Sequence, residues 1–139
     1  MKERIEEKIG EIEEFMNFLI ERIPNNFEDY EKNLEKKAVC ERYLEKIIEA
    51  SVDLAFLVVK YLKIQIPADI SDTEVFVALA SENVISYELS EKMQNAKGMR
   101  NIIAHQYGKI DDEIIFEALS SEIEKDMDDY INSIKLVLK

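Results

Sequence analysis

The chain has 139 residues, which is enough for one domain with a sizeable core, and only 3 Gly and 2 Pro interrupt a composition that is 47% hydrophobic and 35% charged. The 30 acidic residues outnumber the 18 Lys and Arg and give a net charge of −12, which argues against a protein that coats nucleic acid through a broad cationic surface. Few helix breakers and many Glu, Lys, Ile and Leu predict one all-α domain over residues 1–139.

The first helix is predicted from about Lys2 to Arg22, where apolar residues recur at three- and four-residue steps. Pro24 ends it, and Asn26 can cap the next helix. No breaker then occurs before about Lys63, so one long helix is predicted over residues 27–63, at a length that allows for a bend or break. Its second half is apolar almost all round, which predicts a place at the centre of the bundle or in a contact with a second subunit.

Three shorter helices are predicted after this one. Residues 71–74 form a Ser-x-x-Glu capping box that opens a helix ending near Ser81. A fourth helix is predicted from about Tyr87 to Ala104, and Gly98 inside it indicates close packing. A fifth, capped by Asp111, follows to the C-terminus, so the predicted architecture is an up-and-down bundle of about five helices.

Two residues of the long helix carry expectations of their own. Cys40 is the only cysteine and is expected to be a small core residue rather than a nucleophile. Asp53, in the apolar half, is expected to be partly buried in a structural ion pair, with Arg42 or Arg100 as candidate partners.

Nothing in the sequence indicates export or membrane insertion. The first residues are charged and amphipathic, unlike a signal peptide, and the most apolar run, residues 47–62, is too short and too charged to span a bilayer. A single cysteine allows no intramolecular disulfide, which fits a reducing interior. We therefore expect a cytoplasmic protein that does not bind a membrane.

One segment differs in charge from the rest of the chain. No Asp or Glu occurs between Lys92 and Ile110, and this stretch also holds Lys97, Arg100, Lys109 and His105, the only histidine. A locally cationic segment with one imidazole is where a strongly acidic protein could handle a phosphate. We expect Lys97 and Lys109 to form a supporting basic patch around Arg100 and His105.

The remaining residues offer no competing chemistry. One His and one Cys cannot build a zinc site without several carboxylates, and the Glu-x-x-His spacing of di-iron bundles does not occur. Glycine-rich phosphate loops and Ser-centred elbows are also missing. No metal site and no cofactor is predicted.

Helix geometry limits how Arg100 and His105 can cooperate. Five residues on an ideal helix place them about 140° apart, whereas Asn101 and His105 are neighbours one turn apart. Arg100 and His105 can therefore meet at one phosphate only if the helix ends or distorts near Ala104, or if a second subunit completes the site.

These residue types suit RNA cleavage. A neutral imidazole can take the proton from a ribose 2′-hydroxyl, whose oxygen then attacks the adjacent phosphorus. The Arg100 guanidinium can hold two phosphate oxygens and stabilise the developing charge, and Asn101 could orient either group. The simpler interpretation is that His105 is a cation at a helix C-terminus and that Arg100 makes a surface ion pair.

The segment Arg100-Asn101-Ile102-Ile103-Ala104-His105-Gln106-Tyr107 resembles the R-x4-H-x-Y motif of HepT-like toxins in the HEPN superfamily. The setting of the motif is also similar, since it lies near the end of the fourth of five predicted helices. The resemblance covers almost the whole chain. It implies a HEPN-like helical fold and a homodimer with the motifs facing a cleft between subunits. It also implies a metal-independent endoribonuclease that leaves 2′,3′-cyclic phosphate ends, with Arg100 and His105 catalytic and Asn101 beside the catalytic Arg.

The resemblance also implies a partner. Such toxins belong to toxin–antitoxin pairs, of a type II or type VII-like kind, in which a MntA-type minimal nucleotidyltransferase antitoxin transfers AMP from ATP to the motif tyrosine, here Tyr107. The added phosphates would bring negative charge into a site meant for RNA phosphate. The alternative for Tyr107 is a tyrosine that closes the helix end over the core.

Two other functions stay open on sequence grounds. The charge of −12 disfavours RNA and favours a non-catalytic subunit that binds nucleotide, or presents the substrate, in a two-component nucleotidyltransferase. A plain dimeric helical scaffold is the other.

Overall fold

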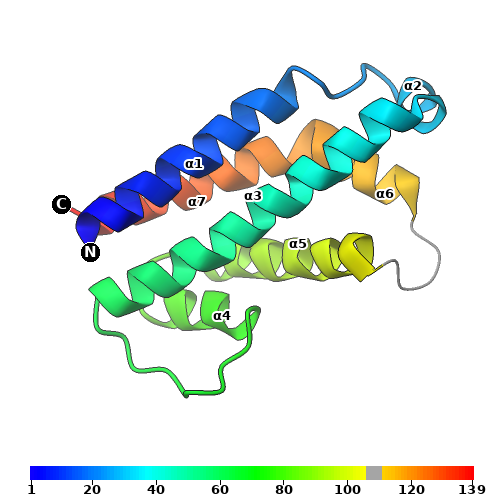
Figure 1. Ribbon diagram of the computed structural model, residues 1–139. Helices are drawn as coiled ribbons and strands as arrows, with labels where there is room; N and C mark the ends of the chain where they lie inside the picture. Colours follow the sequence, from blue (N-terminus) through cyan, green and yellow to red (C-terminus); the bar gives the residue numbers. More distant parts are fainter. Residues whose placement is uncertain (106–110) are drawn as a thin grey trace.

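Four long helices run alternately up and down the computed structural model, with the short helices at their ends (Figure 1). The structure describes residues 1–105 and 111–139, and every regular element in these ranges is helical. The elements are α1 (Lys2–Ile20), α2 (Phe27–Lys32), α3 (Leu34–Tyr61), α4 (Glu74–Ser81), α5 (Tyr87–His105), α6 (Asp112–Glu117), the π-helical segment η1 (Ala118–Glu122) and α7 (Ile123–Val137). The predicted all-α bundle is confirmed. Across the described ranges no helix is long and apolar enough to cross a membrane.

The long helix predicted over residues 27–63 is two helices that meet at Asn33. The backbone of Asn33 is extended (φ −93°, ψ 92°), and its Oδ1 accepts a hydrogen bond from the Lys36 amide at 3.1 Å. This is an N-cap, so an internal Asn starts a new helix where periodicity alone continues the old one. The break turns α2 toward α6, where Tyr30 packs on Phe116 with ring centroids 5.3 Å apart.

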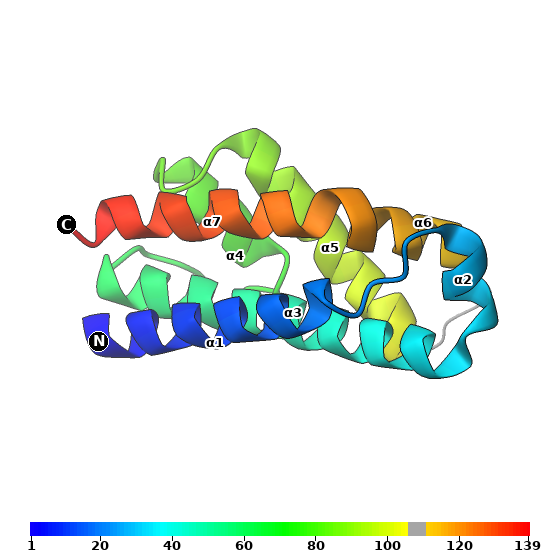
Figure 2. The same ribbon diagram turned by 90° about the horizontal axis from the view of Figure 1, so that it is seen from above.

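The apolar half of α3 lies at the centre of the bundle, as predicted. Its buried residues face α1 on one side and α4 and α5 on the other, and α5 crosses it obliquely (Figure 2). On the α1 side, Tyr43 stacks on Phe18 with ring centroids 4.2 Å apart. Toward α7, the buried Tyr130 hydroxyl donates to the Ser51 carbonyl at 2.7 Å. These contacts anchor α1 and α7 to one central helix.

The two singled-out residues of α3 have different outcomes. Cys40 is fully buried, and burial raises the pKa of its thiol to about 11, so its assignment to the core is confirmed. Asp53 forms an ion pair, as expected, but the expected burial and the expected partners are wrong. Its side chain is 59% exposed and lies 3.8 Å from Lys8 of α1, because this side of α3 faces solvent beside α1. Neither Arg42 nor Arg100 is its partner, since each pairs with a Glu of α3.

The helices α5 and α6 each begin with a side chain that caps the first turn. Ser86 Oγ accepts from the Leu89 amide at the start of α5, a cap that was not predicted. Asp111 Oδ1 accepts from the Glu113 and Ile114 amides at the start of α6, as predicted. The Lys37 ammonium lies 2.7 Å from an oxygen of Asp112 and ties α6 to α3.

Two details of the later helices differ from the prediction. The final helix contains one π-helical turn, where Ser121 Oγ donates to the Glu117 carbonyl at 2.8 Å. Gly98 does not mark close packing within the described chain, because a Cβ added there would meet no atom within 4 Å.

Candidate active site

The last two turns of α5 carry the three motif residues that the structure describes. Leu89 and Ile103 are buried on one side of α5 and hold the helix against the core. Arg100 and Asn101 are half-buried, and His105 is exposed in the final turn. The apolar periodicity of α5 thus leaves the polar motif residues at the surface of a helix whose position is fixed.

Arg100 lies between α5 and α3. Its side chain is 19% exposed, and its Nη2 lies 3.4 Å from Glu49 Oε2. Its Nη1 donates to Asn101 Oδ1 at 3.4 Å, so the structure brings together the predicted catalytic Arg and its neighbouring Asn. Its Nε is buried and has no hydrogen-bond partner among the described residues. The guanidinium therefore keeps unused capacity to donate hydrogen bonds.

His105 points in a different direction from Arg100. α5 stays helical through His105, so the offset of about 140° expected for five helical residues applies to this pair. Within one chain the helix does not distort early enough to bring the two side chains to one face. Tyr107 and Lys109, the other predicted residues of this site, lie outside the described residues.

The cations of the acid-free segment are met by carboxylates from other elements. Lys92 lies 3.8 Å from Asp126 of α7, and Lys97 lies 3.2 Å from Asp72 of the loop before α4. Lys97 is only 8% exposed, so it lacks the free surface that a supporting basic patch requires. Tertiary folding thus neutralises much of a charge excess that exists only along the sequence.

A cavity of about 260 Å³ lies beside the motif helix, between α3, α5, η1 and α7. Met99 and Ile48 contribute to its apolar part, and the Lys92–Asp126 pair lies at its polar side. Burial raises the pKa of Asp126 and outweighs the opposing effect of Lys92. In the two described ranges, no group of three or more His, Cys, Asp or Glu is placed to hold a metal ion.

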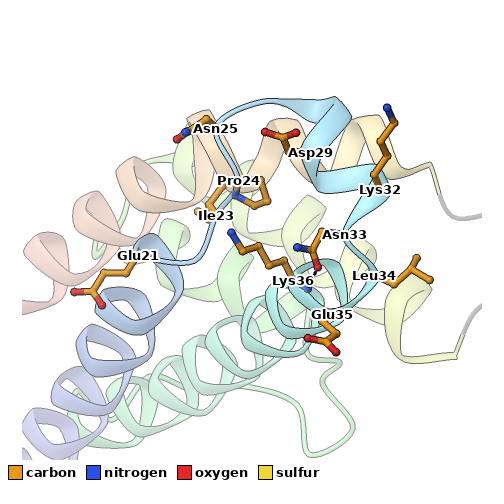
Figure 3. A pocket seen from close by; sticks show the side chains of 10 residues that line it. All are labelled: Glu21, Ile23, Pro24, Asn25, Asp29, Lys32, Asn33, Leu34, Glu35 and Lys36. Atoms are coloured by element: carbon orange, nitrogen blue, oxygen red, sulfur yellow. Dashed lines mark hydrogen bonds between the residues drawn. The ribbon is translucent and has the colours of Figure 1, made fainter.

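A larger pocket of about 750 Å³ lies where α1, α2 and α3 meet (Figure 3). Its lining carries both acidic and basic side chains, and Lys36 extends from the first turn of α3 beside Asn33 and Pro24. None of its lining residues comes from α5, so this pocket is separate from the motif.

Sequence reasoning missed Glu49. It is one of 30 acidic residues and stands 51 positions before Arg100, so no spacing rule connects the two. Only the crossing of α3 and α5 brings them together.

A helical bundle with an Arg-x4-His motif at the end of one long, core-anchored helix defines a HEPN-type protein. The chain belongs to the ribonuclease HepT-like family, whose model matches residues 5–134. The HepT-like ribonuclease family predicted from the motif is therefore confirmed.

Individual relatives agree with this assignment. The chain is 26% identical over 100 residues to a tRNA nuclease HepT of Aphanizomenon flos-aquae, covering 72% of this chain and 67% of that protein. It is 29% identical over 92 residues to an mRNA nuclease HepT of Shewanella oneidensis, covering 66% and 67%. Its fold is similar to that of a tri-AMPylated Shewanella oneidensis HEPN toxin in complex with MNT antitoxin, with a TM-score of 0.87, 24% identity and coverage of 98% and 99%.

Proposed function

We propose that the chain is the toxin of a toxin–antitoxin pair and acts as a metal-independent endoribonuclease through Arg100 and His105. The carrying observation is the Arg-x4-His motif on the exposed end of α5 in a chain of the ribonuclease HepT-like family. The curated relatives named as nucleases, one of tRNA and one of mRNA, support RNA as the substrate class.

In the proposed reaction, a neutral His105 takes the proton of a ribose 2′-hydroxyl. The 2′-oxygen attacks the adjacent phosphorus, the bond to the 5′-oxygen breaks, and that oxygen takes up a proton from an imidazolium or from water. Arg100 binds the phosphate oxygens and stabilises their growing charge, while Asn101 holds the guanidinium through its contact with Nη1. The products are a 2′,3′-cyclic phosphate and a 5′-hydroxyl.

The direction of the two side chains supports a homodimer. Because α5 is helical through His105, Arg100 and His105 of one chain face different ways. A second copy that brings its own motif to the same cleft would place an Arg and a His on opposite sides of one phosphate.

We further propose that a MntA-type nucleotidyltransferase antitoxin neutralises the chain by transferring AMP to Tyr107. The similar HEPN toxin that is described as AMPylated and in complex with MNT antitoxin supports this partner. Tyr107 stands two positions after His105, so phosphates added there would lie close to the site and repel RNA.

With Lys97 buried, Lys109 is the remaining candidate for a basic patch. A cytoplasmic location, where RNA and ATP are available, fits this scheme.

The ribonuclease activity is tested with purified protein, RNA and EDTA. We expect cleavage with 2′,3′-cyclic phosphate ends, and a loss of at least about 100-fold in kcat/KM for Arg100→Ala and His105→Ala. Lys92→Ala is the matched control, because it removes one cation from the same helix without touching the motif. Full activity of His105→Ala would exclude the mechanism.

The second candidate is a non-catalytic subunit that binds nucleotide, or presents the substrate, in a two-component nucleotidyltransferase. Its support is the net charge of −12 together with the carboxylate partners of Lys92, Lys97 and Arg100, which weaken the attraction for RNA. Co-expression with a nucleotidyltransferase should add AMP masses to the wild type and not to Tyr107→Phe. AMP addition without any RNA cleavage by the unmodified protein would favour this candidate.

A further inference from the structure

We propose that Glu49 is a competitor of the substrate phosphate for Arg100 and so sets the RNA affinity of the site. In the free protein Glu49 occupies the guanidinium, and an RNA phosphate must displace it. This inference rests on the proposed function only in naming RNA as the ligand; the competition itself concerns any phosphate.

The contact between Glu49 and Arg100 has the features of a displaceable pair. It joins one nitrogen, Nη2, to one oxygen at 3.4 Å, so it is neither short nor two-pronged. The Glu49 side chain is 54% exposed, whereas the Arg100 side chain is 19% exposed. A carboxylate that stays mostly in water can swing away at little cost.

Arg100 is better matched by a phosphate than by Glu49. Its Nε is buried and has no hydrogen-bond partner among the described residues, and its Nη1 makes only a 3.4 Å contact with Asn101. A phosphodiester offers two oxygens at the spacing of a guanidinium fork. A phosphate can therefore bind both terminal nitrogens of Arg100, whereas Glu49 contacts only Nη2.

Glu49 competes for Arg100 rather than holding it in place. The stem of Arg100 is already confined by burial between α5 and α3, and Asn101 contacts its other terminal nitrogen. Removing the charge of Glu49 should leave this arrangement intact and free Nη2. Glu49→Gln is then expected to tighten phosphate and RNA binding by about 3- to 10-fold. This factor corresponds to the upper part of the free energies measured for exposed ion pairs, or slightly more, because Arg100 is mostly buried.

Asp53 provides a matched control for net charge. It lies one helical turn after Glu49 on α3, its side chain is 59% exposed, and it is 3.8 Å from Lys8 rather than from a motif residue. Asp53→Asn therefore removes the same charge from the same helix without touching Arg100.

The binding test uses three proteins, wild type, Glu49→Gln and Asp53→Asn, each titrated with inorganic phosphate while the Arg Nε–H resonances are followed by NMR. The Arg100 resonance is assigned by its loss in Arg100→Lys. The same substitutions are then compared in His105→Ala, where a fluorescent RNA oligonucleotide binds without being cut. Finally KM and kcat are measured with His105 intact.

We expect Glu49→Gln to lower the half-saturating phosphate concentration, the RNA Kd and KM together, with kcat within about twofold. A competitor weakens binding of the substrate and of the transition state equally, so its removal changes KM and leaves kcat nearly constant. Asp53→Asn should stay close to wild type. An unchanged KM with a fallen kcat would make Glu49 a positioning residue and overturn the proposal. An equal gain in phosphate and RNA affinity in Asp53→Asn would show that the effect comes from the change in net charge, and would overturn the proposal. If no protein cleaves RNA, the ribonuclease assignment fails, but the phosphate titration still decides the role of Glu49.

Discussion

At the scale of single residues, partners decide what each polar group contributes. Tyr30 and Tyr130 are both fully buried, yet their hydroxyls differ. Tyr130 donates to the Ser51 carbonyl at 2.7 Å, whereas the Tyr30 hydroxyl has no hydrogen-bond partner in the described part of the chain. The cost of burying a hydroxyl is offset by a hydrogen bond in only one of the two.

This contrast predicts opposite effects of the same substitution. Tyr130→Phe should lower the free energy of unfolding by about 1 kcal/mol, because a buried hydrogen bond is lost. Tyr30→Phe should leave it unchanged or raise it, because only an unsatisfied hydroxyl is removed. Urea unfolding followed by circular dichroism measures both. A larger loss in Tyr30→Phe than in Tyr130→Phe would contradict the hydrogen-bond assignment.

A second residue-scale prediction concerns pH. Burial raises the pKa of Glu41 above its ordinary value, and nearby Lys37 only partly opposes this. An acid whose pKa is higher in the folded state destabilises the fold once it is ionised, and the penalty disappears as the pH falls below the unfolded value. Glu41→Gln should therefore raise the unfolding free energy near pH 7 and have little effect near pH 3. Glu7→Gln, which removes the same charge at an exposed position, is the control for net charge.

At the scale of elements, glycine is used inside two helices without a packing reason. A Cβ added at Gly10 of α1 or at Gly98 of α5 would meet no atom within 4 Å. Glycine in a helix interior costs conformational entropy relative to alanine.

Gly10→Ala and Gly98→Ala should each raise the free energy of unfolding of the monomer by about 0.5–1 kcal/mol. Thermal unfolding over a range of protein concentrations measures this. A gain for Gly10→Ala with a loss for Gly98→Ala at high concentration would show that a second copy packs on α5 at Gly98. A loss at both positions would contradict the open space around them.

At the scale of the whole molecule, the proposed site needs a second copy of the chain. α5 is anchored to the core and carries Arg100 and His105 in different directions, and α6 beyond the motif is tied to α3 by the Lys37–Asp112 pair. A rigid helix cannot turn both side chains to one phosphate, so the proposed reaction depends on a homodimer.

Sedimentation equilibrium should give a mass near 32 kDa, twice the 16.2 kDa of one chain. Arg100→Ala mixed with His105→Ala should recover about a quarter of wild-type activity, because half of the dimers are mixed and one of their two shared sites is intact. Each variant alone should be inactive. No recovery on mixing, with heterodimers shown by mass spectrometry, would place the Arg and His of each site in one chain.

Much of the fold follows from local rules, and the exceptions have physical causes. Apolar periodicity and caps at Asn26 and Asp111 predict the main helices, because both depend on residues a turn apart. A bend or break within residues 27–63 was allowed for, but its position at Asn33 and the π turn before the last helix were not predicted. At each place a side chain bonds to the backbone, Asn33 to the Lys36 amide and Ser121 to the Glu117 carbonyl. Asn and Ser also occur inside continuous helices, so the residue type alone does not fix where the regular helical pattern is interrupted.

By itself the sequence determined the all-α class, the buried centre of α3 and the motif of Arg100, Asn101 and His105, since these depend on residue type and short spacing. Only the tertiary structure decided the electrostatics of the site. The acid-free segment is cationic along the chain, yet folding brings Glu49 to Arg100 and Asp72 to Lys97. Coulomb interactions depend on distance in space rather than along the sequence, so the charge that a substrate meets is set by how the helices cross.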